Sequence, residues 1–100
     1  MPVAEISVVP VGTDSASISD FVVAALRAVR ASELKYELTS MGTNVEGTLD
    51  QILRLTKRIH ETCLKQGAVR CLTTLKIDDR TDKKLTMQGK VRTVQAKMRK

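Results

Sequence analysis

Polar side chains are concentrated between Thr73 and Val91, more densely than the packing of a core requires. The segment begins within an alternating strand, Val69–Ile77, which ends at the acidic pair Asp78 and Asp79. A basic run follows, and then apolar residues with helical spacing. A junction that gathers hydroxyl, carboxylate and ammonium groups in one place can hold a small ligand or a partner chain.

The same segment carries no pattern specific to a metal or to catalysis. Asp78, Asp79 and Asp82 lack the further spaced oxygen ligands and the glycine of a calcium loop. His60 is the one histidine of the chain, and no nucleophile is linked to it in sequence. Acid–base catalysis needs two titratable groups held close together, and the sequence does not place such a pair. We therefore predict no metal site, no cofactor and no enzymatic activity.

The basic charge of the chain lies at its C-terminal end. The formal net charge is +6, from 17 Lys and Arg against 11 Asp and Glu. Residues 83–100 hold seven of the basic residues and no acidic one, so the rest of the chain is close to neutral. This charge makes nucleic-acid binding an alternative function, but Phe21 and Tyr36 are the sole aromatic residues on which bases could stack. A solvated basic helix or tail, about residues 85–100, is the simpler prediction, without nucleic acid as a partner.

Length and composition predict one globular domain over residues 1–100. The chain is 42% hydrophobic and 28% charged, as ordinary folded domains are. Cys63 and Cys71 lie on the apolar sides of an expected helix and an expected strand, where a free thiol acts as a small hydrophobe. Met1–Pro10 does not resemble a signal peptide, and no apolar run approaches the roughly 20 residues of a membrane helix. We expect a cytoplasmic protein that contacts no membrane and has no disulfides.

Periodicity divides the chain into four strands and three helices. Alternation of apolar and polar residues indicates strands, and apolar residues at three- and four-residue spacing indicate helices. Ser17 with Asp20, and Thr48 with Gln51, have the capping-box arrangement that begins a helix, and Gly67 is a natural left-handed end for the second one. In chain order the expected elements are strand 3–11, helix 17–32, strand 34–39, strand 44–47, helix 48–67, strand 69–77 and helix 87–98.

The patterns also predict which side chains are buried. Val69 is expected to begin the inward face of the fourth strand, and Leu64 to belong to the buried stripe of the second helix. The second strand is expected to be half-buried, because Leu34, Tyr36 and Leu38 alternate with polar residues. The apolar stripe of the last helix is Met87, Val91, Val94 and Met98.

This order of elements predicts an α+β fold, a ferredoxin-like βαββαβ sandwich with an additional short C-terminal helix. Two strand–helix–strand units that obey the right-handed crossover rule give a four-stranded antiparallel sheet with both helices on one face. The second face of such a sheet is uncovered, and its expected residues mix charges and hydroxyls with aliphatic groups such as Val9 and Leu72. Because burial of that face is favourable, we predict self-association into a symmetric homo-oligomer.

Three stretches of the chain resemble a known family. They are the opening strand with Val8, Pro10 and Gly12, then YELTSMGTNVEG at 36–47, and TTLKIDDRTDKKLTMQGKV at 73–91. With the order of the elements, they are similar to the small thiamine-binding, YkoF-like protein family over the chain up to Val94. The resemblance implies a ferredoxin-like subunit, assembly into dimers or tetramers, and binding of thiamine or its aminopyrimidine moiety without catalysis. The basic residues after Val94 lie outside the family motif.

Thiamine combines a flat aminopyrimidine, which has donor and acceptor edges, with a thiazolium cation. Such a ligand needs hydroxyl or backbone partners, a flat apolar contact and a nearby negative charge. The candidates for hydrogen bonds and the flat contact are Ser7, Tyr36, Thr39, Met41, Thr43, Thr73 and Thr74. The candidates for facing the cation are Glu37, Glu46 and Asp78, and those for binding the phosphate of a phosphorylated ligand are Arg80, Lys83 and Lys84.

Each candidate also has a structural interpretation. Tyr36 fits the pleated surface of a half-buried strand, and Met41 belongs to a turn. Mixed charges such as those of residues 78–84 also serve salt bridges between subunits or solubility. A purely structural oligomeric domain therefore stands as an alternative beside a binding protein.

Overall fold

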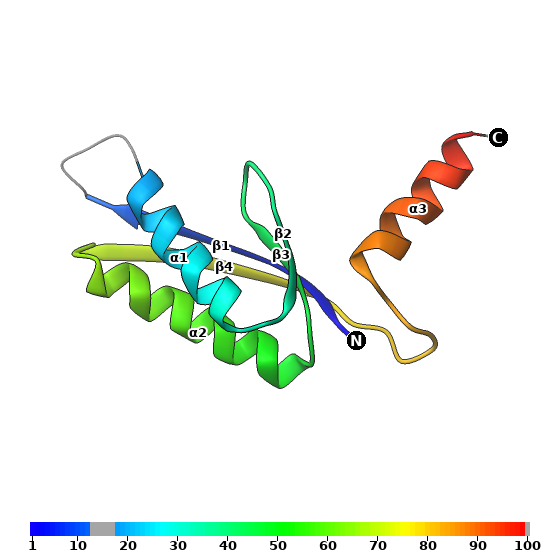
Figure 1. The fold of residues 1–100 in the computed structure, drawn as a ribbon, viewed down its shortest axis with the longest axis horizontal. Coiled ribbons are helices and arrows are strands. Elements are labelled where there is room, and N and C mark those ends of the chain that lie inside the picture. Colours follow the sequence, from blue (N-terminus) through cyan, green and yellow to red (C-terminus); the bar gives the residue numbers. More distant parts are fainter. Residues whose placement is uncertain (13–17, 100) are drawn as a thin grey trace.

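The fold has two layers, a four-stranded sheet and a pair of helices (Figure 1). The computed structural model describes residues 1–12 and 18–99. The antiparallel sheet has the strand order β2-β3-β1-β4, with β1 (Val3–Val11), β2 (Lys35–Leu38), β3 (Thr43–Glu46) and β4 (Arg70–Asp78). Helices α1 (Ser19–Ala31) and α2 (Leu49–Lys65) cover one face, and α3 (Met87–Met98) follows β4.

This is the ferredoxin-like arrangement that the sequence predicts. The elements follow one another as β1-α1-β2-β3-α2-β4, with α3 at the end. Because β1 lies between β3 and β4, the two strand–helix–strand units are interleaved in one sheet. The predicted α+β class, the antiparallel sheet and the additional C-terminal helix are confirmed.

The core lies between the sheet and the pair α1 and α2. Alternation along β1 turns Ala4 and Ile6 toward the helices, where each keeps 3% of its surface exposed. Each fully buried aliphatic side chain contributes about 1.5–3 kcal/mol of hydrophobic stabilisation. Ala4 and Ile6 are therefore the residues of β1 that belong to the buried core cluster. The other buried members of this cluster are Ala28, Val29, Val45, Ile52, Leu55 and Ile59.

Both ends of α2 have the signals that define them in the sequence. Thr48 Oγ1 accepts a hydrogen bond from Gln51 N (3.1 Å), and Gln51 Oε1 accepts one from Thr48 N (2.9 Å), which completes the predicted capping box. The helix ends before Gly67, whose φ of +102° suits glycine. The prediction that Leu64 is buried is wrong, because it lies about 100° around the helix from Cys63 and faces solvent.

Helix α1 begins without a side-chain cap at its N-cap residue, Ile18. Ser17, the residue predicted to cap it, lies outside the described residues. The other end of the helix is closed by Ser32, whose Oγ donates to Val29 O (2.5 Å) and accepts from Leu34 N (3.2 Å). The predicted end near Ser32 is confirmed.

Two predictions about strand burial are wrong. All four residues of β2 are exposed, although the alternation of Tyr36 and Leu38 with polar residues predicts a half-buried strand. β2 is an edge strand, and the helices pack on β1 and β4 instead. Val69 lies in the connection before β4, so it is exposed and does not open the inward face of that strand.

Helix α3 forms in spite of Gly89. Thr86 is its N-cap residue, and Thr86 Oγ1 accepts a hydrogen bond from Gly89 N (2.9 Å). A Cβ at position 89 would lie 2.7 Å from that oxygen, so the glycine makes room for the cap. Met87 is buried, whereas the rest of the predicted stripe is exposed. The helix is therefore confirmed, but its stripe does not face the core of its own chain.

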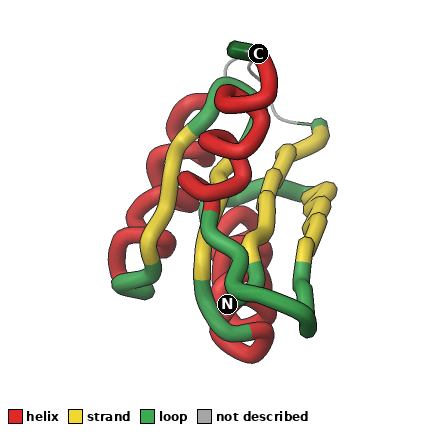
Figure 2. The backbone as a smooth tube through the Cα atoms, turned by 90° about the vertical axis from the view of Figure 1, so that its right-hand side faces the viewer, coloured by secondary structure: helices red, strands yellow, loops and turns green. Residues whose placement is uncertain are grey.

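Helix α3 leaves the two-layer body at the end of β4. It extends beyond the sheet in Figure 1, and Figure 2 shows its last turn well away from the N-terminus of the chain. The longest described helix, α2, has 17 residues, and no helix in the described part of the chain is long and apolar enough to cross a membrane.

We expect Thr48→Ala to lower the free energy of unfolding by about 1 kcal/mol, because it removes the side-chain acceptor for Gln51 N. For a domain of this size the corresponding fall in Tm is roughly 4–8 °C. Thr62→Ala is the matched control, since Thr62 is exposed on the same helix and its hydroxyl donates to Arg58 O (2.7 Å) within the helix. Thermal unfolding followed by circular dichroism compares them, and equal Tm changes would contradict a specific role of the cap.

Candidate functional site

A cavity of about 230 Å³ opens between the β2–β3 hairpin, β1 and α1, and we call it the hairpin cavity. Its floor is apolar and consists of Ile6, Val8, Ile18, Val22, Ala25, Val29 and Ile59. Its rim is residues 38–43 of the hairpin, with Ser7 and Val9 of β1. Sites for drug-sized ligands have roughly 300–1,000 Å³. The smaller hairpin cavity suits one flat ring.

Thr39 holds the turn of the hairpin over this cavity. Its Oγ1 accepts hydrogen bonds from Met41 N (3.2 Å) and Gly42 N (3.1 Å) and donates to Gly42 O (3.0 Å). Gly42 lies against β1, where a Cβ would approach Ile6 O to 3.0 Å. The missing side chain at position 42 therefore lets the hairpin close toward the central strand.

Four of the predicted ligand residues line the hairpin cavity: Ser7, Thr39, Met41 and Thr43. Ser7 is paired with Thr74, so its side chain is directed to the outer face of the sheet. Among the described residues, no side-chain hydrogen bond occupies the hydroxyl of Thr43, whereas Thr39 is engaged in the turn. Met41 is exposed at the tip of the hairpin, and its unbranched side chain adapts readily to an apolar partner. The cavity thus offers the uncommitted hydroxyl of Thr43 and an adaptable apolar cover.

A second groove, of about 490 Å³, lies on the outer face of the sheet beside α3. Strand register places Glu37, Asn44, Glu5 and Lys76 in one row across this face. Asp78 also lines the groove, and its carboxylate pairs with Lys90 of α3. Two of the predicted cation-facing residues, Glu37 and Asp78, are thus on the opposite side of the sheet from the hairpin cavity.

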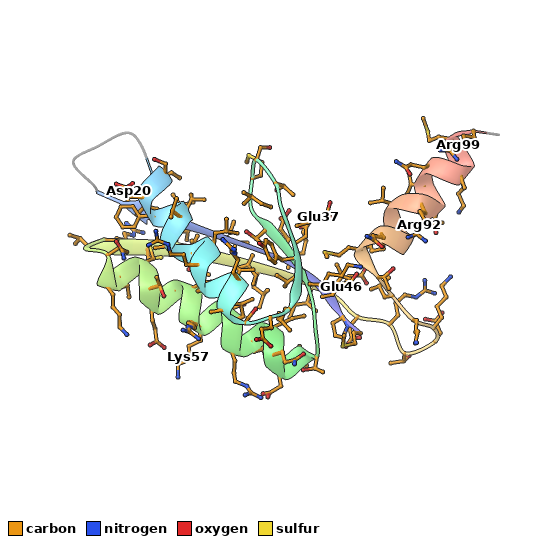
Figure 3. All side chains as sticks on the ribbon, viewed as in Figure 1. Asp20, Glu37, Glu46, Lys57, Arg92 and Arg99 are labelled. Carbon is orange, nitrogen blue, oxygen red and sulfur yellow. The ribbon has the colours of Figure 1, made fainter. Side chains whose placement is uncertain are left out.

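Glu46, the third predicted acid, lies between β3 and the start of α3, as Figure 3 shows. It is 8% exposed, and its Oε1 accepts a hydrogen bond of 2.5 Å from Met87 N. A carboxylate at this position also faces the positive end of the helix dipole. Glu46 therefore anchors α3 to the sheet.

Three further candidates do not line the hairpin cavity: Tyr36, Thr73 and Thr74. Thr73 faces α2, where its hydroxyl is 2.7 Å from His60 Nδ1. Thr74 lies on the outer face of the sheet. Tyr36 is opposite Val45 and therefore on the helix-facing side of the edge strand.

The predicted anion-binding residues meet in the loop before α3. Arg80, Lys83 and Lys84 line a groove of about 360 Å³ at the start of that helix. The guanidinium of Arg80 donates to the two carboxylate oxygens of Asp82, from Nε at 2.8 Å and from Nη2 at 2.5 Å. This pairing lowers the pKa of the Asp82 carboxyl. Arg80 is therefore neutralised by Asp82, whereas Lys83 and Lys84 form no ion pair with the described residues that line this groove.

Sequence reasoning missed that two cysteines, a histidine and a threonine meet between α2 and β4. Burial, followed by the smaller effect of neighbouring Cys71, raises the pKa of the Cys63 thiol from 9.0 to about 12. Cys71 Sγ lies 3.6 Å from Thr73 Oγ1, which also contacts His60. Spacing predicts each half of this cluster, because Cys63 is three residues from His60 on a helix and Cys71 is two from Thr73 on a strand, but it does not predict that the two halves meet.

The sheet, its two helices and the cavity beneath the hairpin define a small ferredoxin-like domain with room for one ring. Residues 4–95 match the family described as "Thiamine-binding protein". The chain belongs to this family, as the resemblance of its motifs predicts.

Relatives and solved structures agree with this assignment. A UPF0045 protein of Methanothermobacter thermautotrophicus is 41% identical over 99 residues, which are 98% of this chain and 100% of that protein. The structure of a hypothetical protein from Methanocaldococcus jannaschii has a TM-score of 0.88 and 39% identity, covering 94% of this chain and 95% of the other. A Thermotoga maritima structure, whose name assigns it to thiamine biosynthesis or salvage, has a TM-score of 0.80 and 25% identity, covering 93% and 97%.

We expect Cys63 to be alkylated at least about tenfold more slowly than Cys71 in the native protein near pH 8, because its thiol is buried and its raised pKa leaves little thiolate. Peptide mass spectrometry after brief treatment with iodoacetamide measures both rates, and full unfolding in guanidinium is the control that equalises them. Equal native rates would contradict the burial of Cys63. The raised pKa also favours folding below about pH 9, and this contribution is lost as the pH rises toward about 12.

Glu46→Gln keeps the shape of the side chain that holds α3 but removes its charge. A hydrogen bond to a charged group is worth about 1.5–3 kcal/mol, so we expect amide exchange in α3 to accelerate about tenfold while α2 is unaffected. Glu37→Gln is the control, because Glu37 is exposed on the outer face. Hydrogen–deuterium exchange measures both variants, and an unchanged α3 in Glu46→Gln would show that this carboxylate does not anchor the helix.

Proposed function

We propose that this protein binds thiamine or its aminopyrimidine moiety without transforming it, and that it does so as a cytoplasmic homo-oligomer. The observation that carries the proposal is the hairpin cavity, which is apolar, has room for one ring and is rimmed by hydroxyl groups. Membership of the thiamine-binding protein family supports the same ligand. So does the similarity to a Thermotoga protein named for thiamine biosynthesis or salvage.

The cavity suits the aminopyrimidine end of thiamine better than the thiazolium end. Ile6 and Val8 on one side, with Met41 on the other, offer a flat ring apolar contact on both faces. A cation placed there would lose its hydration without a charged partner, since no carboxylate is among the described residues that line the cavity. We therefore place the neutral ring inside and the thiazolium at the rim.

A hydroxyl group would bind the polar edge of the ring. Thr43 is paired with Ile6 and so lies on the helix-facing side of the sheet, where its hydroxyl can pair with a ring nitrogen or with the amino group. Thr39 has a different role, because its hydroxyl holds the turn that covers the cavity. In this proposal Thr43 contacts the ligand, Met41 covers it, and Thr39 positions the cover.

Phosphorylation of the ligand is not expected to strengthen binding within one subunit. The hairpin cavity lies on the helix side of the sheet, around Ile6–Val9 of β1. The loop with Lys83 and Lys84 follows Asp78, which pairs with Val3 at the other end of β1. A phosphate attached to a ligand in the cavity is therefore far from these charges.

A binding role without chemistry fits the composition of the cavity. None of the described residues that line it has a titratable side chain, and general acid–base catalysis requires such groups within hydrogen-bonding reach of the substrate. A carrier, buffer or sensor of the ligand needs just the binding site. The free thiols of Cys63 and Cys71 suit a reducing cytoplasm.

Isothermal titration with thiamine, its mono- and diphosphates, the free aminopyrimidine and the free thiazole tests this proposal. We expect the aminopyrimidine and thiamine to bind saturably with one site per subunit, the phosphates to bind no more tightly, and the thiazole not to bind. Binding of the thiazole alone, or no heat with any of the five, would contradict the proposed site.

Two variants connect that binding to the hairpin cavity. Ala25→Leu fills the floor and is expected to abolish binding, whereas Ala24→Leu, on the same helix but outside the lining, preserves it. Thr43→Val keeps the shape and removes one hydroxyl, so affinity is expected to fall about 2–10-fold. Thr74→Val makes the same change on the outer face and is the control. Circular dichroism verifies that all four remain folded.

A further inference from the structure

The two cysteines of the chain lie against each other between α2 and β4. α2 leads directly into β4, so residues nearer the end of the helix face residues nearer the start of the strand. Cys63 is about 4.5 Å along the helix from His60, and Cys71 is about 6.6 Å along the strand from Thr73, both toward this connection. Because His60 contacts Thr73, these matched steps bring the two thiols together. The Cys63 thiol accordingly forms a hydrogen bond with Cys71.

The two thiols differ in their access to solvent. Cys63 is buried, with 3% of its surface exposed, whereas Cys71 is half-buried. Burial and the neighbouring Cys71 raise the pKa of the Cys63 thiol, which leaves little thiolate at that position. Oxidation of cysteine depends on thiolate and on exposure. Cys71 is therefore the thiol that a small oxidant meets first.

A chain of hydrogen bonds leads from the Cys71 thiol to an imidazole. Cys71 Sγ lies 3.6 Å from Thr73 Oγ1, and Thr73 Oγ1 lies 2.7 Å from His60 Nδ1. When the thiol donates to the hydroxyl oxygen and the hydroxyl donates to Nδ1, a proton can pass from sulfur to the ring. The thiolate is the nucleophile in thiol chemistry. This relay therefore produces the reactive form of Cys71.

We propose that Cys71 and Cys63 form a reversible disulfide with a peroxide as the oxidant, and that Cys71 reacts first while Thr73 and His60 take up its proton. Disulfides that form in a reducing compartment are typically transient and redox-sensing. The inference goes beyond the proposed function and is independent of it, because none of the four residues lines the hairpin cavity.

The first step consumes the peroxide. The Cys71 thiolate attacks one peroxide oxygen, and the O–O bond breaks. The leaving hydroxide takes the proton held by His60 and becomes water, and Cys71 becomes a sulfenic acid.

The second step forms the disulfide. The sulfur of Cys63 attacks the sulfur of Cys71, the S–O bond breaks, and the hydroxide leaves with the Cys63 proton as a second water. The raised pKa of Cys63 does not prevent this step, because the reaction is intramolecular between groups already in contact. The two thiols together lose two electrons and the peroxide gains them. A dithiol returns the pair to the reduced state by exchange and is itself oxidised to a disulfide.

Brief treatment of the native protein with stoichiometric hydrogen peroxide tests the proposal. Trypsin places the cysteines in the separate peptides 59–65 and 71–76, because basic residues lie between them. We expect mass spectrometry to find these two peptides joined by a disulfide, and separated again after dithiothreitol. Protein unfolded in guanidinium is the control, and it is expected to form the link at least about tenfold more slowly, because the contact is lost.

Three results would overturn the proposal. The first is a sulfinic acid on Cys71 while Cys63 is unchanged. The second is a disulfide that joins peptide 71–76 to the same peptide of another chain. The third is a pair of intact thiols under conditions that oxidise free cysteine.

The order of the two steps is tested by Cys63→Ala and Cys71→Ala. Cys63→Ala is expected to stop at the sulfenic acid of Cys71, which dimedone traps, and Cys71→Ala is expected to leave Cys63 reduced. Oxidation of Cys63 in Cys71→Ala at the rate of the wild-type pair would contradict the order. Circular dichroism verifies that both variants are folded.

Thr73→Val keeps the shape of the side chain and removes the hydroxyl of the relay. In the Cys63→Ala background we expect dimedone labelling of Cys71 to slow at least about tenfold, since general-base assistance is lost. Thr73→Ser restores a hydroxyl and is expected to recover most of the rate. Thr74→Val makes the same change on the outer face of the strand and is the control. Equal rates in Thr73→Val and Thr74→Val would contradict the relay.

Discussion

The alternation of side chains along β1 is the constraint on which the rest of the structure depends. β1 pairs with β3 on one side and with β4 on the other, so its register sets the faces of both neighbours. Ala4 and Ile6 enter the core, while Glu5 and Ser7 are directed to the outer face. A slip of one residue would exchange the two faces and bring Glu5 into the core. The same register fixes where the hairpin cavity lies, and it sets the row of Glu37, Asn44, Glu5 and Lys76 across the outer face. It also sets the position of Glu46, which anchors α3.

The hairpin cavity follows from small side chains beneath a closely packed hairpin. Gly42 lets the hairpin approach β1, and Val22 and Ala25 are too short to fill the space below it. With aromatic residues at 2% of the chain, few large side chains are available to do so. An unfilled apolar cavity lowers stability in proportion to its volume. A ring that enters it recovers part of this loss, which couples ligand binding to the stability of the hairpin.

Sequence patterns predicted the elements wherever neighbouring residues decide the conformation, as in β1 and in the Thr48–Gln51 capping box. Burial at Leu64, Val69 and β2 was predicted wrongly, because it depends on where the helices end over the sheet. Four candidate site residues share a cavity because three of them are neighbours in one hairpin. The contact of Glu46 with Met87 spans 41 residues and that of Thr73 with His60 spans 13, separations that no local pattern encodes.

A crystal structure of the complex with the free aminopyrimidine tests the central claim most directly. The account predicts the ring beneath the β2–β3 hairpin, stacked between Ile6 and Met41 with its polar edge on Thr43. A ring bound instead in the outer groove beside Glu37 and Lys76, with the hairpin cavity unoccupied, would contradict it.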